Sequence, residues 1–582
     1  MDVTVRNWLM PQMSNLLDRM LREGRGMRLD GVPVFEAHDQ FLPGKIAGAL
    51  ALLLLETPRS DPNFERYVAG FRRISDMTVD DENHSWGIYY YVSALYRLKQ
   101  AGLLERAVSP ETLAKLRIKL DWRLFVRRDF TLIDLPNNYY GVAFSIARLR
   151  MLLGWEDASG SNKLFARMID HYRRYSGAYG FADETDGEGR FDRYSVLLIG
   201  EIAQRLIETG TPAPPEVKQA LRRSVDLMLL RFNMRGEGWE YGRSIGPYGE
   251  TCFLEVMTAA AKLGLLNARE QAMAYAFSAR IAARYMDFWV DPATGSVNMW
   301  DGGRRTDDYR SKNRILGENL SLARQYIYTN EEWNELGFRD RAPDPGYADW
   351  LARLPKSTLT WFARERFDRA LLTVRDGSHV IGLPLVNGAE SQHMHNPYFP
   401  IPFSPGMLSG APDATWPQLV PRVTLEDGTV LMPLAWFRDV RVTRHGDTTI
   451  LTYRQDLVDR MGGPAPVQDG RLQVATRYEF SHGRITRSDV LTPVHPLAVK
   501  ALDLVFASFS TGARQAAPGE VRFAEGEVGR FEAQGFHSCA AAPVDAAPYR
   551  APSGPFRSLV TCASGPFSLS RPVSLSWTIS YR

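Results

Sequence analysis

The sequence predicts an α+β chain of two parts, helical over residues 1–355 and built of antiparallel β-sheet over residues 356–582. Three observations support this division. Apolar residues recur three and four apart before about residue 285, strict alternation appears in the last third of the chain, and the change falls near Pro355. At 582 residues the chain exceeds what one hydrophobic core usually organises, so more than one structural unit is expected.

The helical part is predicted from apolar stripes that end in glycine, the residue that most easily closes a helix in the left-handed conformation. One stripe runs from Ile88 to Leu98 before Gly102. The same pattern precedes the turns at Gly154, Gly177, Gly210 and Gly264. Roughly ten to twelve helices joined by short turns imply antiparallel hairpins packed side by side.

The β part is predicted from alternating apolar and polar residues. Residues 472–480 alternate up to a turn at His482-Gly483, residues 502–506 form a second strand, and residues 573–581 alternate in the same way. Strands with one apolar face pack in pairs of sheets, so a sandwich is expected.

The bulk composition excludes several classes of protein. Apolar residues make up 45% and charged residues 24%, which is ordinary globular usage. Lys and Arg number 70 against 67 acidic residues, so no global field draws the chain to nucleic acid. The apolar run 49–55 is too short to span a bilayer, and the first residues lack the pattern of a secretory signal. We expect a cytoplasmic protein, or a periplasmic or secreted one if a signal has been removed.

Cysteine and histidine usage gives no sign of a cofactor. Cys252, Cys539 and Cys562 are too few and too scattered for a disulfide framework or a tetrahedral zinc site. Free buried thiols are expected, with a single Cys539–Cys562 bridge as the alternative. His393 and His395 would share one face of a strand, as a metal site requires, but no third ligand lies near them in sequence. We expect no metal or other cofactor here, and one catalytic imidazole.

Polar and aromatic residues cluster where four of the predicted helices begin. The segments are Asp80–Trp86, Pro136–Tyr140, Phe191–Tyr194 and Trp239–Glu250. In a ring of helical hairpins one set of helix starts faces the same mouth, so these segments are expected to line a single cleft. The alternative for any one segment is that Asn or Asp caps the helix and Tyr packs between helices. Four such segments favour the cleft.

The order of these features resembles the polysaccharide lyases of the heparinase II/III and alginate lyase superfamily. The resemblance rests on the large helical part, the Asn137-Asn138 helix start, the stretch from Ser244 to Tyr248 and the histidine-bearing segment of the β part. It implies an incomplete (α/α) toroid followed by an antiparallel β-sandwich. It also implies cleavage of a uronic-acid-containing glycan by β-elimination. Gly249 departs from the pattern, because heparinase-like lyases tend to carry histidine there, and this leaves the base open.

The resemblance also implies roles for individual residues. In the family a tyrosine of the helical part acts as acid and sometimes as base, a histidine helps as base, and Asn or Arg binds the uronate carboxylate. The matching catalytic residues are Tyr248, His393 or His395, Asn138 and Arg243. The substrate-binding candidates are Asn137, Tyr139, His84, Trp86, Arg193, Tyr194, Trp239 and Tyr241.

The chemistry of elimination explains these residue types. Loss of the proton beside the carboxylate leaves an enolate-like dianion, which an amide or guanidinium donor stabilises by roughly 3–4 kcal/mol. Histidine titrates near neutral pH and can take this proton. A tyrosine base needs a cation such as Arg243 or Arg193 to lower its pKa.

The sequence leaves two other functions open. An inverting glycoside hydrolase on the same scaffold needs two carboxylates about 6.5–9.5 Å apart. The carboxylates considered for it are Asp80, Asp81, Asp183, Asp186, Glu240 and Glu250. A non-catalytic carbohydrate-binding protein would stack sugars on Trp86, Trp239 and Trp300. The expected partner is a uronate-containing polysaccharide or oligosaccharide, with no nucleic acid and no membrane, and the oligomeric state is not predicted.

Overall fold

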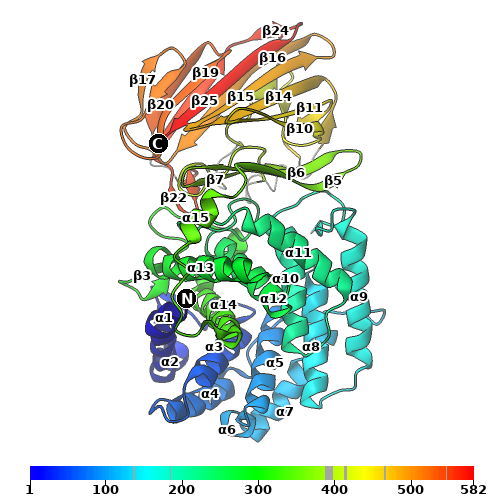
Figure 1. The fold of residues 1–582 in the computed structure, drawn as a ribbon, viewed down its shortest axis with the longest axis vertical. Coiled ribbons are helices and arrows are strands. Elements are labelled where there is room, and N and C mark those ends of the chain that lie inside the picture. The colour runs from blue at the N-terminus through cyan, green and yellow to red at the C-terminus, as the bar shows by residue number, and fades with distance from the viewer. Residues whose placement is uncertain (136–137, 184, 387–397, 412–415, 464–466, 545–546) are drawn as a thin grey trace.

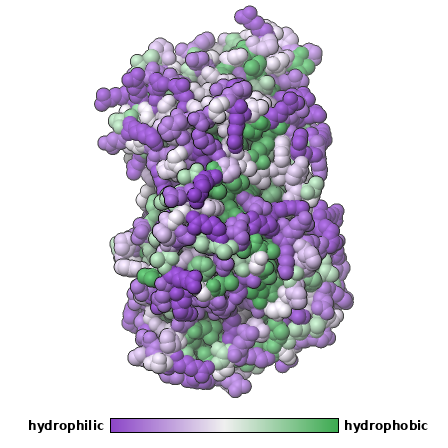
Figure 2. Space-filling view, in the orientation of Figure 1, coloured by the Kyte–Doolittle hydropathy of each residue, from purple (hydrophilic) through white to green (hydrophobic). Residues whose placement is uncertain are grey.

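In the computed structural model, a helical part and a β part lie end to end (Figure 1). The structure describes residues 1–135, 138–183, 185–386, 398–411, 416–463, 467–544 and 547–582. The last helix, α15, ends at Ala352, and the first strand of the β part, β5, begins at Ser357. The molecule narrows between the two parts, and Figure 2 shows polar residues over most of this face with apolar residues between them.

Six helices form a closed inner ring in the helical part. They are α3 (Leu42–Glu56), α5 (Ser85–Gln100), α8 (Tyr139–Leu153), α10 (Arg193–Glu208), α12 (Pro247–Lys262) and α14 (Ile315–Trp333). Each packs on the next, and α14 packs back on α3. The outer helices alternate with them along the chain: α2 (Met10–Glu23), α4 (Phe64–Thr78), α7 (Pro110–Lys119), α9 (Ser159–Ser176), α11 (Pro215–Leu229) and α13 (Ala268–Arg284). The arrangement is the predicted (α/α) toroid of helical hairpins, with a closed inner ring where an incomplete one was expected.

The burial of these helices follows from their sequences. The inner helix α3 buries every residue from Leu42 to Leu54, because it is covered by neighbours on all sides. The outer helix α9 is amphipathic and buries only one narrow face. The glycines predicted to close helices do so, since Gly102, Gly154, Gly177, Gly210 and Gly264 all have positive φ.

The β part contains two antiparallel sheets that make the predicted sandwich. The first has the order β10 (Arg438–His445), β11 (Thr448–Gln455), β14 (Leu472–Ser481), β15 (Arg484–Pro493), β25 (Val573–Tyr581), β19 (Val528–Gln534), β18 (Glu520–Arg522) and β17 (Arg514–Ala517). The second has the order β13 (Val467–Asp469), β12 (Val458–Arg460), β9 (Val430–Met432), β8 (Arg422–Leu425), β16 (Leu497–Ser508), β23 (Ser558–Ser564) and β20 (Ser538–Pro543), with β24 (Phe567–Leu569) also on β16. A third sheet, β5 (Ser357–Arg364), β6 (Asp368–Asp376) and β7 (His379–Leu385), lies between the sandwich and the toroid (Figure 1).

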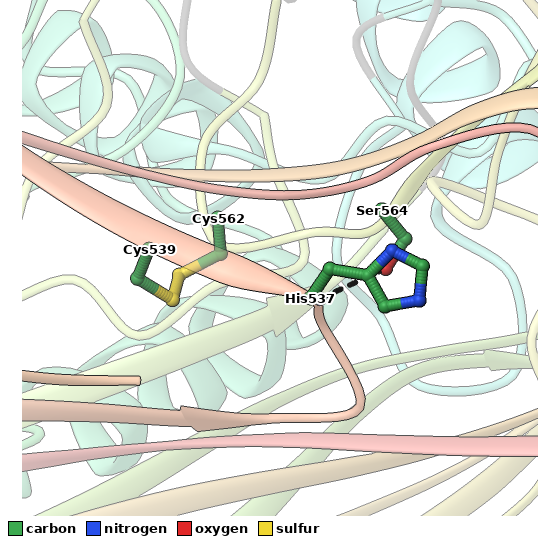
Figure 3. Close-up of a disulfide and its surroundings, with 4 residues drawn as sticks. All are labelled: His537, Cys539, Cys562 and Ser564. Carbon is green, nitrogen blue, oxygen red and sulfur yellow. Dashed lines mark hydrogen bonds between the residues drawn. A yellow bond between two sulfur atoms is a disulfide. The ribbon is translucent and has the colours of Figure 1, made fainter. Parts of the chain in front are cut away.

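The two cysteines of the sandwich form a disulfide, which corrects the expectation of free thiols (Figure 3). Cys539 of β20 lies directly opposite Cys562 of β23 in the antiparallel register, and their Cα atoms are 4.0 Å apart. This pairing depends on the register of two strands, which the sequence spacing does not reveal. Cys252 is a free buried thiol, as expected. Within the described residues, no helix is both long enough and apolar enough to cross a membrane.

Candidate functional site

A cavity of about 340 Å³ runs inward from the N-terminal ends of the inner helices. Its volume is that of a typical small-ligand site. All six inner helices, or the turns just before them, contribute side chains. The lining includes Lys45, Trp86, Tyr89, Tyr90, Asn138, Tyr139, Arg193, Tyr194, Glu201, Arg205, Arg243, Tyr248, Glu255, Tyr309, Arg310, Arg314, Arg324 and Gln325.

The lining forms two tiers along the helices. Tyr194 and Glu201 of α10 are seven residues apart, as are Tyr248 and Glu255 of α12. Residues with this spacing share one helix face and lie about 10.5 Å apart along the axis. We call the side chains at the helix starts the outer tier: Lys45, Tyr194, Arg243, Tyr248, Arg310 and Arg314. The inner tier lies about two helical turns deeper and consists of Glu201, Arg205, Glu255 and Arg324.

Tyr248 lies in the first turn of α12 and keeps its proton. Its hydroxyl donates a hydrogen bond to Glu318 Oε2, and the guanidinium carbon of Arg310 lies 3.6 Å from its ring centroid. Burial and the charge of Glu318 raise the pKa of Tyr248 well above its usual value, and Arg310 offsets only part of this effect. A cation therefore does lower this pKa, but by less than burial and Glu318 raise it. The neutral phenol is suited to the role of an acid and not of a base.

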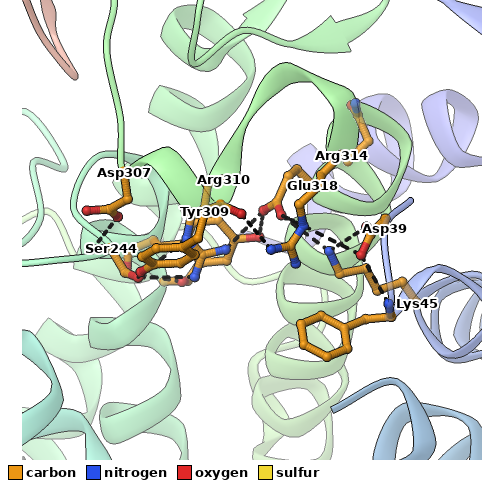
Figure 4. A network of polar contacts seen from close by, with 12 residues as sticks. Asp39, Lys45, Ser244, Asp307, Tyr309, Arg310, Arg314 and Glu318 are labelled. Carbon is orange, nitrogen blue, oxygen red and sulfur yellow. Dashed lines mark hydrogen bonds and ion pairs between the residues drawn. The ribbon is translucent and has the colours of Figure 1, made fainter. Parts of the chain in front are cut away.

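Glu318 is the centre of a buried polar network (Figure 4). Lys45 Nζ lies 3.2 Å from Glu318 Oε1, and Arg314 Nε lies 3.4 Å from the same atom. Arg310 Nη1 lies 3.1 Å from Glu318 Oε2. Burial opposes the charge of Glu318, but these three cations outweigh burial and lower the pKa of the carboxyl. The carboxylate therefore stays ionised and holds the hydroxyl of Tyr248 in place.

Ser244 connects the outer tier to the loop before α14 (Figure 4). Arg310 Nη2 donates to Ser244 Oγ at 3.1 Å, and the backbone N–H of Ser244 donates to Asp307 Oδ2 at 2.7 Å. The hydroxyls of Ser244 and Tyr194 lie 3.2 Å apart. Ser244 has a φ of 55°, an unusual value for a residue with a side chain, and these contacts stabilise that conformation.

Asp192 holds Tyr194 and Arg243 beside one another. It caps α10, where its Oδ1 accepts the backbone N–H of Tyr194 at 2.8 Å. Its Oδ2 accepts the backbone N–H of Arg243 at 3.4 Å and the hydroxyl of Tyr398 at 2.5 Å. The guanidinium carbon of Arg243 lies 4.5 Å from the centroid of the Tyr194 ring. Through Tyr398, the β part is attached to the edge of the cavity.

Cations outnumber carboxyl groups around the cavity. Among the described residues the lining cations are Lys45, Arg193, Arg205, Arg243, Arg310, Arg314 and Arg324, and the lining carboxyls are Glu201 and Glu255. Burial and the neighbouring Glu201 raise the pKa of Glu255 to about 8, and burial raises the pKa of Glu201. The two carboxyls therefore do not carry two full charges near neutral pH. Glu318 and Asp39, which do not line the cavity, pair with Lys45, Arg310 and Arg314. The other four lining cations still exceed the charge of the two carboxyls, so the lining is electropositive and fits an anionic ligand.

Several side chains of the lining carry buried polar atoms without a hydrogen-bond partner among the described residues. These atoms are Asn138 Oδ1, Arg193 Nη1, Glu201 Oε2, Arg205 Nε and Gln325 Nε2. Buried polar atoms without partners are uncommon in folded proteins, because each costs free energy. Their concentration around one cavity is typical of a site that a ligand completes.

The structure brings most of the predicted site residues to this cavity. They are Trp86, Asn138, Tyr139, Arg193, Tyr194, Arg243 and Tyr248. Three others do not line it. Trp239 and Tyr241 are buried, and the Tyr241 hydroxyl donates to the carbonyl of Phe191 at 2.9 Å. His84 is exposed and pairs with Glu82. Asn137, His393 and His395 lie outside the described residues.

Position 249 has no room for the histidine that heparinase-like lyases tend to carry. A Cβ on Gly249 would lie 2.4 Å from the carbonyl oxygen of Trp239, and the backbone N–H of Trp239 donates to the carbonyl of Gly249 at 2.9 Å. The Trp239 side chain itself is buried. A histidine is therefore excluded at this position.

The carboxylates considered for a hydrolase pair do not line the cavity. Asp80 pairs with Lys119 on the surface, at 2.9 Å. Glu240 pairs with Arg231, and Glu250 accepts hydrogen bonds from Arg284 and Trp289. The remaining three, Asp81, Asp183 and Asp186, are also absent from the lining.

The charged residues inside the inner helices were not predicted from the sequence. Lys45, Glu201, Glu255 and Arg324 each lie in a helix that is otherwise largely apolar and buried. A charge on a buried helix face needs a partner or a function, and this pattern is the signal that would have found them. Within the described residues, no group of three His, Cys, Asp or Glu side chains could hold a metal ion.

Two solved structures match this architecture over nearly the whole chain. Heparinase III matches with a TM-score of 0.50 at 10% identity, over 94% of this chain and 76% of its own. A mutant of the chondroitin AC lyase of Streptomyces coelicolor A3 matches with a TM-score of 0.51 at 11% identity, over 100% of this chain and 82% of its own. The chain has the polysaccharide lyase fold. No family model and no curated protein matches the sequence.

Proposed function

We propose that this protein is a lyase that cleaves a uronic-acid-containing polysaccharide or oligosaccharide by β-elimination. The observation that carries the proposal is one electropositive cavity that combines a protonated phenol, Tyr248, with the amide of Asn138 and the guanidinium of Arg243. The fold shared with heparinase III and chondroitin AC lyase agrees with it.

In this mechanism the outer tier binds the uronate carboxylate. Asn138 and Arg243 hydrogen bond to it and stabilise the charge that develops when the proton on the adjacent carbon is removed, by roughly 3–4 kcal/mol per donor. The electron pair of that C–H bond forms the new C=C bond, and the bond to the leaving oxygen breaks. Tyr248 gives its proton to this oxygen, for which its hydroxyl must turn from Glu318 to the substrate. Arg310, stacked on the ring, stabilises the phenolate that results.

We assign the removal of the proton to His393 or His395. An imidazole titrates near neutral pH and so can serve as a base there. The described residues that flank the histidine segment support this assignment, since Val386 and Tyr398 are both buried and Tyr398 hydrogen bonds to Asp192 at the cavity edge. The variants His393→Phe and His395→Phe show which of the two histidines is the base, because only loss of the base abolishes turnover.

An absorbance screen tests the proposal. The panel consists of alginate, glucuronans, glycosaminoglycans and rhamnose-glucuronate polymers. A lyase forms an unsaturated product that absorbs in the ultraviolet. A hydrolase forms new reducing ends without this absorbance, and a binding protein forms neither. Reducing ends without absorbance on every polymer that is cleaved contradict the proposal.

We also propose that the protein works in an oxidising compartment. The Cys539–Cys562 disulfide supports this, because such bonds persist mainly outside the reducing cytosol. Thiol titration of the denatured protein, isolated from its host without reductant, should detect Cys252 alone. Detection of all three thiols would contradict an oxidising compartment.

A further inference from the structure

The inner tier brings two carboxyl groups together where two helices cross. Helices α10 and α12 approach closely at Gly200, where a Cβ would lie 2.7 Å from Cγ2 of Val256. Glu201 and Glu255 are the next residues to this contact on their helices, and both side chains line the cavity. The missing side chain at position 200 thus allows the two carboxyl groups to face the same space.

The surroundings keep this pair from carrying two full negative charges near neutral pH. The charged and titratable groups that face it are Arg193 and Arg205 of α10, Arg324 of α14, Tyr90 of α5 and Cys252 of α12. Burial disfavours both charges and the carboxyls repel each other, while the three arginines favour ionisation. Because burial raises the pKa of Glu201 and raises that of Glu255 to about 8, the pair retains at least one proton near neutral pH.

In this region one acceptor and two donors have no hydrogen-bond partner among the described residues. Glu201 Oε2 accepts no hydrogen bond, and Arg193 Nη1 and Arg205 Nε donate none, within the part of the chain that the structure describes. Both arginines are fixed by other bonds. Arg193 Nε donates to the carbonyl of Tyr248 at 2.8 Å, and Arg205 Nη1 donates to the carbonyl of Glu201 at 2.8 Å.

A hydroxyl group fits this set better than an anion does. A hydroxyl can donate to Glu201 and accept from Arg193 or Arg205 at the same time. A sulfate or a carboxylate can only accept, so it would leave Glu201 Oε2 without a donor. The outer tier differs, because Glu318 and Asp39 pair with its cations and do not themselves line the cavity.

We propose that Glu201 and Glu255 bind unmodified sugar hydroxyls and thereby select uronate glycans that carry no sulfate ester at this position. The inference rests on the proposed lyase function and names its substrate class. With the uronate carboxylate in the outer tier, the hydroxyls of the neighbouring sugar reach the inner tier about 10.5 Å along the helices.

The test uses polymers in matched pairs that differ only in sulfation. The pairs are glucuronan and chemically O-sulfated glucuronan, alginate and sulfated alginate, and chondroitin and chondroitin sulfate. Calorimetry on oligosaccharides of each pair measures affinity, and ultraviolet absorbance measures turnover. The wild type should bind the unsulfated member about tenfold more tightly or better.

Three variants assign this preference to the carboxyl pair. In Glu255→Gln, and more so in the double variant with Glu201→Gln, the preference should fall to about threefold or less, because an amide also donates to sulfate. Glu250→Gln is the matched control. It neutralises a buried carboxyl on the same helix, bonded to Arg284 and Trp289 away from the cavity, and should keep the full preference. Circular dichroism shows whether each variant is folded, and if the double variant is not, Glu255→Gln decides.

The outcomes for the two proposals differ. Equal or tighter binding of a sulfated member by the wild type overturns the inference, as does a preference that survives in the folded Gln variants. A hydroxyl preference in binding without any unsaturated product contradicts the lyase proposal alone. Absence of binding by every pair overturns both.

Discussion

The helical part and the sandwich each bury a network of charges, and the two networks are built differently. In the sandwich, Arg487 Nε lies 2.8 Å from Asp489 Oδ2, and its Nη2 lies 3.0 Å from Asp489 Oδ1. Its Nη1 donates to the Tyr478 hydroxyl at 2.9 Å, and Thr476 donates to Asp489 at 2.7 Å. One cation meets one carboxylate, and both are almost completely buried.

In the helical part, three cations surround Glu318 and a cavity borders them. Asp39 also pairs with Lys45 and Arg314, but the cavity beside this network is lined by polar atoms that have no partner in the described structure. A buried ion pair that is complete in itself organises the fold at little net gain in stability. A cavity whose lining leaves polar atoms without partners is where a ligand supplies the missing hydrogen bonds.

The largest expected difference between the two networks concerns their tyrosines. Tyr248→Phe should lower kcat by about 10²–10⁴-fold, because the leaving oxygen loses its acid, while binding of oligosaccharide changes little. Tyr478→Phe is the matched control. It removes an equally buried phenol that donates to the carbonyl of Pro400 at 2.9 Å, and should cost about 1–2 kcal/mol of stability with kcat unchanged. Initial rates measure kcat and urea unfolding measures stability, for both variants. Normal rates in Tyr248→Phe would remove the acid from the mechanism.

Removal of an arginine should cost more stability in the sandwich than in the helical part. Arg487→Met leaves Asp489 buried and unpaired and should destabilise the sandwich by about 3–5 kcal/mol. Arg310→Met should cost less, because Glu318 retains Lys45 and Arg314. Arg310→Met should instead lower kcat/KM. Urea midpoints and initial rates compare the two, and a larger loss of stability in Arg310→Met would contradict the distinction between the networks.

The disulfide should stabilise the sandwich without affecting the cavity. It closes a sequence separation of 23 residues, for which loop entropy predicts about 3 kcal/mol. The double variant Cys539→Ser and Cys562→Ser should therefore unfold at lower urea concentration but keep the kcat of the wild type at temperatures where it is folded. A loss of kcat in the folded variant would show that the sandwich and the cavity are coupled.

A buried carboxyl with a raised pKa in each part of the molecule should make stability fall as pH rises. Burial raises the pKa of Glu255 in the cavity to about 8, and burial raises the pKa of Asp459 in the sandwich to about 8. Between the unfolded pKa values, 4.5 and 3.8, and this folded value, the native state binds more protons than the unfolded state. The stabilisation is therefore complete below these unfolded values and is lost as pH approaches 8. Melting temperatures from pH 4 to 9 should fall less steeply in Glu255→Gln and in Asp459→Asn than in the wild type. An unchanged slope in both would contradict these shifts.

The parts of the fold that depend on local pattern were predictable. Helix stripes closed by glycine and alternating strands appear at the expected positions because their periodicity is set by neighbouring residues. The helix starts were recognised for the same reason, and they lead to Tyr248, Arg243 and Asn138. Long-range pairing was not predictable. Lys45 and Glu318 are 273 residues apart, and the register that joins Cys539 to Cys562 exists only in the assembled sheet.

The mass of the reaction products tests the central claim most directly. Cleavage of a uronate oligosaccharide of known length by the wild type should give a new non-reducing fragment that is one water molecule lighter than its hydrolysis counterpart, because elimination forms a double bond without consuming water. Tyr248→Phe should form this fragment far more slowly, and Tyr478→Phe at the normal rate. A fragment with the full hydrolysis mass would contradict β-elimination in this cavity.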